Sequence, residues 1–301
     1  MRGGVEISSK LLFLGIVGAL MVAAVTVFIV TPRTTLADAN LSCTVLDDIP
    51  FENEKQIASM PTWQGNSSIK TFGAAKKDTT NILYSFADEY SFYKAGDGIL
   101  IKNVGTDVDG DDYDLKITMT KAHGQSLKSM GVSSYDDSLA RFDVFCSSGK
   151  KHVVGERLCM YTSVRGNGDL DFRYEWLKHG TSEAANVLAF MQIGDLDNYI
   201  GNDRAWWADD NFNGGEGVQL NDGKAYLSSN TKLSKDVSNG KFWISKAKAG
   251  NTDGKDWSTC VAYASSKSYA DITLGAATVP DIYFDPHEAP AVPVKDFAIK
   301  G

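Results

Sequence analysis

Apolar and polar residues alternate most regularly in the middle of the chain. Four apolar or aromatic residues there take every second position, with charged residues between them: Leu170, Phe172, Tyr174 and Trp176. This period of two is that of a half-buried β-strand. A second apolar run covers residues 187–193, after a polar loop, and stops before Asp195 and Asp197. The pattern therefore predicts two strands of one sheet, the second of which is followed by two aspartates.

Further strands are expected on both sides of this pair. Apolar or alternating runs cover residues 98–104, 113–120, 139–145 and 158–164, and shorter ones cover 217–220, 224–227, 241–246, 260–264 and 269–274. Turns rich in Asn, Asp and Gly separate the shorter runs. Residues 81–93 are rich in aromatics and are expected to be partly helical. Many short strands with little other helical period predict an all-β fold, an antiparallel β-sandwich of jelly-roll or immunoglobulin-like type.

The N-terminus has the features of an export signal. Arg2 and Lys10 precede an uninterrupted apolar run over residues 11–30, and the sequence Ala-Asp-Ala at residues 37–39 then supplies a small-residue cleavage site. The run is also long enough to span a bilayer, so an uncleaved transmembrane helix is the alternative to a signal peptide removed after Ala39. In either case the remaining chain lies outside the cytoplasm, and membrane contact is expected only through this segment.

Three regions follow from these patterns. Residues 1–39 form the signal peptide or anchor, residues 40–284 the β-sandwich domain, and residues 285–301 a proline-rich linker. Three of the seven prolines lie in residues 285–294, which suits an extended, semi-rigid connection. The end of the chain, from Lys295, is expected to begin a further module.

The composition is that of a folded, acidic protein. The chain has 301 residues, of which 43% are hydrophobic, and this is enough for a sizeable core. Its net charge is −8, and no basic stripe runs along the sequence. This argues against a nucleic-acid partner, because such a partner needs a row of Lys and Arg side chains to neutralise its phosphate groups and release their counterions.

The four cysteines are expected to form disulfides, because exported proteins reach an oxidising compartment. Three pairings are possible. We favour Cys146 with Cys159, since these residues flank the turn over residues 147–151 and would staple a hairpin. Cys43 would then pair with Cys260 and join the two ends of the domain. Metal ligation by cysteine is disfavoured, since no two cysteines have the CxxC spacing.

An acidic segment between two predicted strands resembles half of a calcium-binding loop. Oxygen ligands stand there close together around a glycine that permits a sharp turn: Asp107, Asp109, Asp111 and Asp114. The twelfth position counted from Asp107, where a complete loop of this type has Glu, is Thr118. The alternative is an acidic hairpin tip in which Asp and Gly serve turn geometry. Calcium is the one cofactor that the sequence suggests.

A second acidic cluster follows the strand over residues 187–193 and includes two neighbouring tryptophans. Its members are taken as a candidate ligand-binding site: Asp195, Asp197, Trp206, Trp207, Asp209 and Glu216. Carboxylates around an aromatic pair could bind calcium and stack against a sugar ring. Two of them could also act as the general acid and base of a glycosidase. The third interpretation is a surface loop whose tryptophans fold back over the core.

The strand and turn sequences also resemble those of a protein family. The segments that carry the resemblance are residues 98–105, 113–120, 170–176, 193–197 and 215–218. They are similar to the N-terminal β-sandwich modules of large Gram-positive surface proteins, adhesins with pilin-type or isopeptide-bonded domains. The resemblance covers roughly residues 80–285. It implies a place at the cell surface or cell wall, with a host or cell-surface glycan or protein as partner. The sequence lacks the motifs of that family's isopeptide and thioester crosslinks, so we assign neither.

Catalytic motifs are missing from the sequence. The four histidines lie far apart, and there is no HExxH, no Gly-x-Ser-x-Gly and no glycine-rich phosphate loop. The chain is therefore predicted to be a non-enzymatic extracellular module that acts in adhesion or as the structural head of a surface stalk. The alternatives are a calcium-assisted carbohydrate-binding module and a secreted glycosidase.

Overall fold

The computed structural model describes most of the chain between residues 61 and 194 and several strands on either side. The described residues are 41–45, 61–80, 84–131, 136–165, 168–187, 189–194, 196, 217–220, 223–227, 233–236, 243–246, 260–265, 267–275 and 281–283. The chain divides into two compact units, residues 1–35 and 36–301, and every described residue belongs to the second. The predicted signal or anchor and the predicted linker lie outside the described residues. In the described part, no helix is long and apolar enough to cross a membrane.

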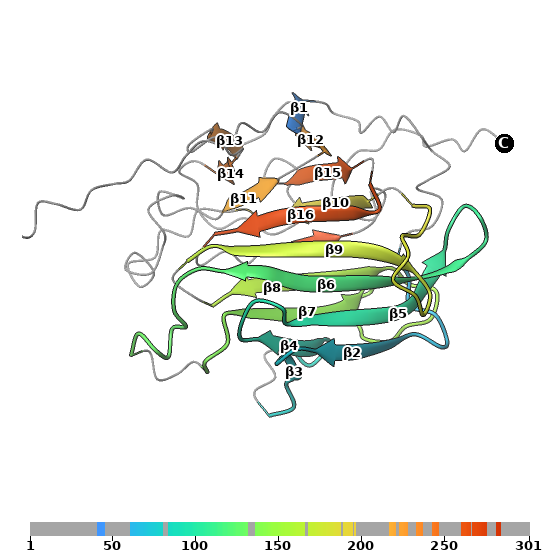
Figure 1. Ribbon diagram of the computed structural model, residues 1–301, viewed down its shortest axis with the longest axis horizontal. Coiled ribbons are helices and arrows are strands. Elements are labelled where there is room, and N and C mark those ends of the chain that lie inside the picture. The colour runs from blue at the N-terminus through green and yellow to red at the C-terminus, as the bar shows by residue number, and fades with distance from the viewer. Residues whose placement is uncertain are drawn as a thin grey trace, which may run out of the picture. The chain divides into compact units, whose positions relative to one another are not determined.

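The described residues form strands without a helix, and these strands make two sheets (Figure 1). Across the nine-stranded sheet the order is β1 (Leu41–Val45), β12 (Gly223–Leu227), β15 (Val261–Ser265), β10 (Ala189–Gly194), β17 (Asp281–Tyr283), β8 (Leu158–Val164), β7 (Ala140–Cys146), β4 (Asp88–Phe92) and β3 (Lys76–Lys77). Across the eight-stranded sheet it is β13 (Leu233–Asp236), β14 (Trp243–Lys246), β11 (Gly217–Leu220), β16 (Tyr269–Leu274), β9 (Leu170–Lys178), β6 (Asp112–Ala122), β5 (Gly98–Thr106) and β2 (Ser68–Phe72).

Neighbouring strands are antiparallel, apart from the parallel pair β1 and β12. The predicted all-β, antiparallel fold is therefore confirmed for the described residues. The strongest sequence patterns form the neighbouring strands β5, β6 and β9 in one sheet and the pair β7 and β8 in the other. The expectation of partial helix over residues 81–93 is wrong, because Asp88–Phe92 form β4. Tyr90 and Phe92 alternate with Glu89 and Ser91 in this strand, but the run is short and further aromatics on both sides of it obscure the period of two.

One hydrophobic core lies between the two sheets. The alternating apolar residues of β9 are buried in it, together with Ile117 of β6 and Val261 of β15. Phe142 of the nine-stranded sheet meets Phe172 of the eight-stranded sheet edge to face, with ring centroids 5.2 Å apart. The two sheets thus pack as layers, and each turns one face toward the shared core.

The chain changes sheet repeatedly in its second half. From β8 onward, successive strands belong to alternate sheets, with the hairpin of β13 and β14 as the one exception among the described strands. Consecutive strands therefore lie in opposite layers, and their neighbours within a sheet come from distant parts of the sequence.

Buried Asp97 fixes two turns at one end of the sheets. Its Oδ1 accepts a hydrogen bond from the backbone N–H of Ala74 at 2.6 Å, and its Oδ2 accepts those of Tyr93 and Lys94 at 2.8 and 3.1 Å. Gly73 has a φ of +69° and runs so close that a Cβ atom there would lie 2.6 Å from Asp97 Oδ1. The carboxylate therefore joins the β2–β3 turn to the β4–β5 turn.

We expect Asp97→Ala to lower the free energy of unfolding by about 2 kcal/mol or more, since the part-buried N–H groups of Ala74 and Tyr93 lose their acceptor and a buried N–H without an acceptor costs about 1–3 kcal/mol. Urea unfolding at neutral pH measures the change. Asp137→Ala is the matched control, because that exposed carboxylate forms a surface ion pair with Lys128. We expect it to change stability by less than about 0.5 kcal/mol. Equal losses in the two variants would contradict the role of Asp97.

Candidate functional site

The acidic, tryptophan-bearing cluster lies outside the described residues. This applies to every member of the predicted ligand-binding site: Asp195, Asp197, Trp206, Trp207, Asp209 and Glu216. The strand that leads into it, β10, ends at Gly194, directly before the cluster. Ligand binding there stays a prediction.

Asp107 closes the tip of the β5–β6 hairpin, where the calcium loop is predicted. Its Oδ1 accepts the backbone N–H groups of Asp109 and Asp111, both at 3.0 Å, and its Oδ2 accepts that of Asn186 at 2.8 Å. Burial opposes the charge of Asp107, but these donors outweigh it and hold the pKa of the carboxyl below its ordinary value. The side chain thus shapes the turn and ties it to the segment that follows β9.

The other three aspartates of this segment also have protein partners. Asp109 accepts a hydrogen bond from the Asn186 amide at 3.0 Å, and Asp111 pairs with Lys178 Nζ at 2.7 Å. Asp114 is buried on β6, where it accepts the backbone N–H of Asn103 at 2.7 Å and Nδ1–H of His179 at 2.6 Å. Within the described part of the chain, no group of three or more His, Cys, Asp or Glu side chains is placed to hold a metal ion. The contacts favour the acidic hairpin tip over the calcium loop, and calcium binding itself stays untested.

The predicted disulfides are not formed by Cys146, Cys159 or Cys260, all of which are buried. In the antiparallel pair β7 and β8, Cys146 lies opposite Leu158 and Cys159 lies opposite Phe145. Opposed residues share a face, so Cys146 points into the core between the sheets and Cys159 points to the other side. The predicted Cys146–Cys159 pairing is therefore wrong.

The second predicted pairing, Cys43 with Cys260, has no support in the strand order. Cys43 lies on β1 and Cys260 directly precedes β15, and β12 lies between these two strands. The side chain of Cys43 lies outside the described residues.

A charged cluster is buried on the face of the nine-stranded sheet that points away from the shared core. Glu89 of β4 lies opposite Asp143 of β7, and Ser91 lies opposite Arg141. Arg141 Nε donates to Asp143 Oδ1 at 2.7 Å, and Arg141 Nη2 lies 2.9 Å from Glu89 Oε1. All three charged side chains are buried, and one oxygen of each carboxylate, Glu89 Oε2 and Asp143 Oδ2, has no hydrogen-bond partner among the described residues.

Sequence reasoning missed this cluster. The run over residues 139–145 alternates, which assigns Arg141 and Asp143 to a solvent face, whereas every residue of β7 is buried. The signal that could have found them is an Arg and an Asp two positions apart in a strongly apolar strand, which places a cation and an anion on one face.

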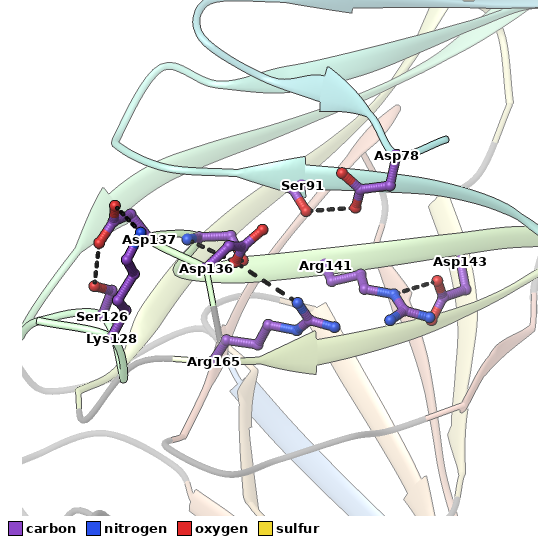
Figure 2. Close-up of polar contacts among 10 residues, drawn as sticks. Asp78, Ser91, Ser126, Lys128, Asp136, Asp137, Arg141, Asp143 and Arg165 are labelled. Carbon is purple, nitrogen blue, oxygen red and sulfur yellow. Dashed lines mark hydrogen bonds and ion pairs between the residues drawn. The ribbon is translucent and has the colours of Figure 1, made fainter. Parts of the chain in front are cut away.

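Arg165 extends the cluster beyond the end of β8, as Figure 2 shows. Its Nη1 lies 3.7 Å from Asp136 Oδ1, and on β4 Ser91 Oγ donates to Asp78 Oδ2 at 2.6 Å. Burial and the nearby positive charge of Arg141 lower the pKa of Arg165. For Asp143, burial raises the pKa to about 6, and the hydrogen bond from Arg141 opposes this shift only in part.

A basic corner lies at the β3 edge of the same sheet, formed by Lys77, Lys150, Lys151 and His152. Three of its members surround the buried carboxylate of Asp88. Lys77 Nζ and His152 Nε2 lie 2.9 and 2.8 Å from Asp88 Oδ2, and Lys151 Nζ lies 3.7 Å from Oδ1. Burial opposes the charge of Asp88, but these cations, Lys77 foremost, lower the pKa of its carboxyl.

The backbone and a ring stack fix the position of His152 in this corner. Its imidazole stacks on Trp63 with ring centroids 4.3 Å apart and an interplanar angle of 19°. Its φ is +61°, a left-handed conformation that is uncommon for residues other than glycine.

The outer face of the eight-stranded sheet shows a different charge pattern. Lys116 pairs with Glu175 at 2.9 Å, and Arg173 pairs with Asp271 through two contacts of 2.7 Å. The guanidinium of Arg173 also lies over the ring of Tyr269, 4.5 Å from its centroid. Ion pairs between neighbouring strands recur on this face, whereas several cations share one buried carboxylate in the basic corner.

Comparisons with known proteins give distant likenesses of structure and no relative in sequence. No family model matches the chain, and no curated protein matches it. Among solved structures, the N-terminal domain of an adhesin from Streptococcus gordonii aligns with a TM-score of 0.47 and 11% sequence identity. The alignment covers 80% of this chain and 66% of that domain.

We expect calcium to shift the melting temperature of the parent chain and of the double variant Asp109→Asn/Asp111→Asn equally, within about 1 °C. The reason is that the carboxylates of the hairpin tip already have N–H and ammonium partners. Thermal unfolding with and without millimolar calcium tests this, and the double variant separates the tip from any other calcium site. A calcium shift that the double variant abolishes would assign the ion to the tip.

We expect Asp143→Asn to become more stable relative to the parent as pH rises from 4 to 7. With its pKa raised from 3.8 to about 6, folded Asp143 holds a proton that the unfolded chain releases. The parent therefore loses stability as pH rises through this window, by about 3 kcal/mol, whereas Asn cannot ionise. Urea unfolding at four pH values measures the difference, and a difference independent of pH would contradict the shift.

Proposed function

We propose that this chain is a non-enzymatic extracellular module of a bacterial surface protein, and that it acts as an adhesive head. The observation that carries the proposal is the use of buried carboxylates to hold loops. Asp97, Asp107 and Asp114 each accept N–H groups from turns that are distant in the sequence. Loops fixed in this way on a two-layer β scaffold are suited to presenting binding residues outside the cell.

Two features of the sequence support the same proposal. The charged, apolar and small-residue regions of residues 1–39 direct the chain out of the cytoplasm. The strand and turn sequences of the domain resemble the N-terminal modules of Gram-positive surface proteins. The partner of such a module is a glycan or protein on a host or neighbouring cell.

The finer type of fold that we propose is a jelly roll. From β8 onward, successive strands mostly alternate between the two sheets. This alternation supports the proposal, since a jelly roll wraps the chain around both layers in this way.

The proposal predicts that the chain is exposed on intact bacteria and that it mediates attachment. Antibodies against residues 61–194 should label unpermeabilised cells of the producing strain, and deletion of the gene should reduce adherence to its natural surfaces several-fold. Soluble chain, added as competitor, should reduce adherence of the parent strain to the same degree.

Two controls make this experiment decisive. Labelling of a cytoplasmic protein reports cell lysis, and a plasmid copy of the gene should restore adherence in the deletion strain. Labelling only after permeabilisation would contradict the surface location, and unchanged adherence of the deletion strain would contradict the adhesive role.

A further inference from the structure

We propose that the basic corner binds an acidic polysaccharide. The inference rests on the proposed adhesive function and names the class of ligand for it. The site consists of Lys77 on β3 together with Lys150, Lys151 and His152 in the turn between β7 and β8.

The first argument is the local excess of positive charge on an acidic chain. The net charge is −8, yet the four members of the basic corner are cationic or titratable side chains, and all are exposed. Asp88 is the carboxylate that contacts three of them. Glu156, which accepts from the N–H of Ser148, is a second carboxylate of the same turn and keeps its charge, while Asp78 contacts Ser91 on the face that Lys76 shares. Three lysines and a titratable histidine thus stand against two carboxylates, and a surface with an excess of cations attracts a polyanion.

The second argument is that the cations are held in place and still have donors to offer. Asp88 is buried, with a side-chain exposure of 7%, whereas Lys77 and Lys151 keep exposures of 46% and 42%. An ammonium group has three N–H donors, and one contact with Asp88 leaves two for a ligand. The side chains are therefore ordered before binding, which reduces the entropy lost when a ligand docks.

The third argument concerns the lysines of the turn. Lysine on an edge strand such as β3 is a common protection against pairing with other chains. That explanation covers Lys77 but gives no reason for Lys150 and Lys151, which lie in a turn. Binding of a polyanion accounts for all three lysines, because its charges would contact the edge strand and the turn together.

The shortage of exposed apolar surface favours a polysaccharide over a protein. Protein interfaces have apolar cores rich in aromatic residues and Met. Among the described residues, the exposed large hydrophobic side chains are Val108, at the acidic tip, and Val154, beside the basic corner. A sugar polymer that carries anionic groups on successive residues needs cations at intervals and no apolar core.

The test measures binding of the full chain to immobilised polymers. Heparin and polygalacturonate are the acidic polysaccharides, one sulfated and one bearing only carboxylates, with dextran as the neutral polymer and polyglutamate as the acidic polypeptide. We expect binding to heparin or polygalacturonate that weakens as NaCl rises from 50 to 300 mM, and no binding to dextran.

The deciding variant is Lys150→Gln/Lys151→Gln, which removes two cations of the corner and keeps the contacts of Lys77 and His152 with Asp88. We expect it to weaken binding to the acidic polysaccharide about tenfold or more, equivalent to about 1.4 kcal/mol. The matched control is Lys121→Gln/Lys128→Gln, which removes two exposed lysines elsewhere and should change binding less than about twofold.

Each other outcome would overturn the inference. Unchanged binding in the corner variant, or an equal loss in the control, would show that the corner is not the site. Tighter binding of polyglutamate than of both polysaccharides would assign the corner to an acidic protein. Absence of binding to every acidic polysaccharide would reject this ligand class, while surface labelling and adherence of the deletion strain would still report on the adhesive function separately.

Melting temperatures of both variants within about 2 °C of the parent would show that folding is preserved.

Discussion

The packing of two sheets on one shared core is the constraint on which the rest of the structure depends. The contact between Phe142 and Phe172 marks where the layers meet. Because side chains alternate along a strand, every second residue points into this core and the residues between point to the outer face of the sheet. The two outer faces accommodate their polar residues in different ways. On the eight-stranded sheet the outer face carries matched ion pairs. On β4 and β7 the outer face is itself buried, and the charged residues there form ion pairs with one another.

Acidic residues in this protein serve as internal hydrogen-bond acceptors as well as surface charges. Asp97 and Asp107 each accept three backbone N–H groups, so these carboxylates replace the hydrogen bonds that irregular loops cannot form with neighbouring strands. Part of the acidic composition of a protein can therefore serve to supply hydrogen-bond acceptors for the backbone N–H groups of its loops. The basic corner has the opposite arrangement, in which one buried carboxylate organises several cations at the surface.

Sequence patterns locate most of these strands but do not show whether a polar face is exposed or covered. The patterns of β6, β7, β9 and β10 place these strands correctly, but the alternation of β4 is too short to stand out, and Arg141 and Asp143, which look like surface residues, are buried. The disulfide prediction fails for a related reason. Cys146 and Cys159 are close across a turn, but an offset of one residue in register sends the two side chains to opposite faces. The hairpin tip was identified as acidic, although the sequence could not show that backbone N–H groups occupy its carboxylates.

The last described strand has a consequence for how the domain can be divided. β17 lies between β10 and β8, with pairing to both, so it joins two parts of the nine-stranded sheet. The other sheet depends similarly on β16, whose Asp271 is 98 residues from its partner Arg173 on β9. A fragment that ends before residue 281 would leave β8 and β10 with unpaired edges, open to association with other chains. The sandwich therefore cannot be shortened from this side without splitting the sheet at an internal strand.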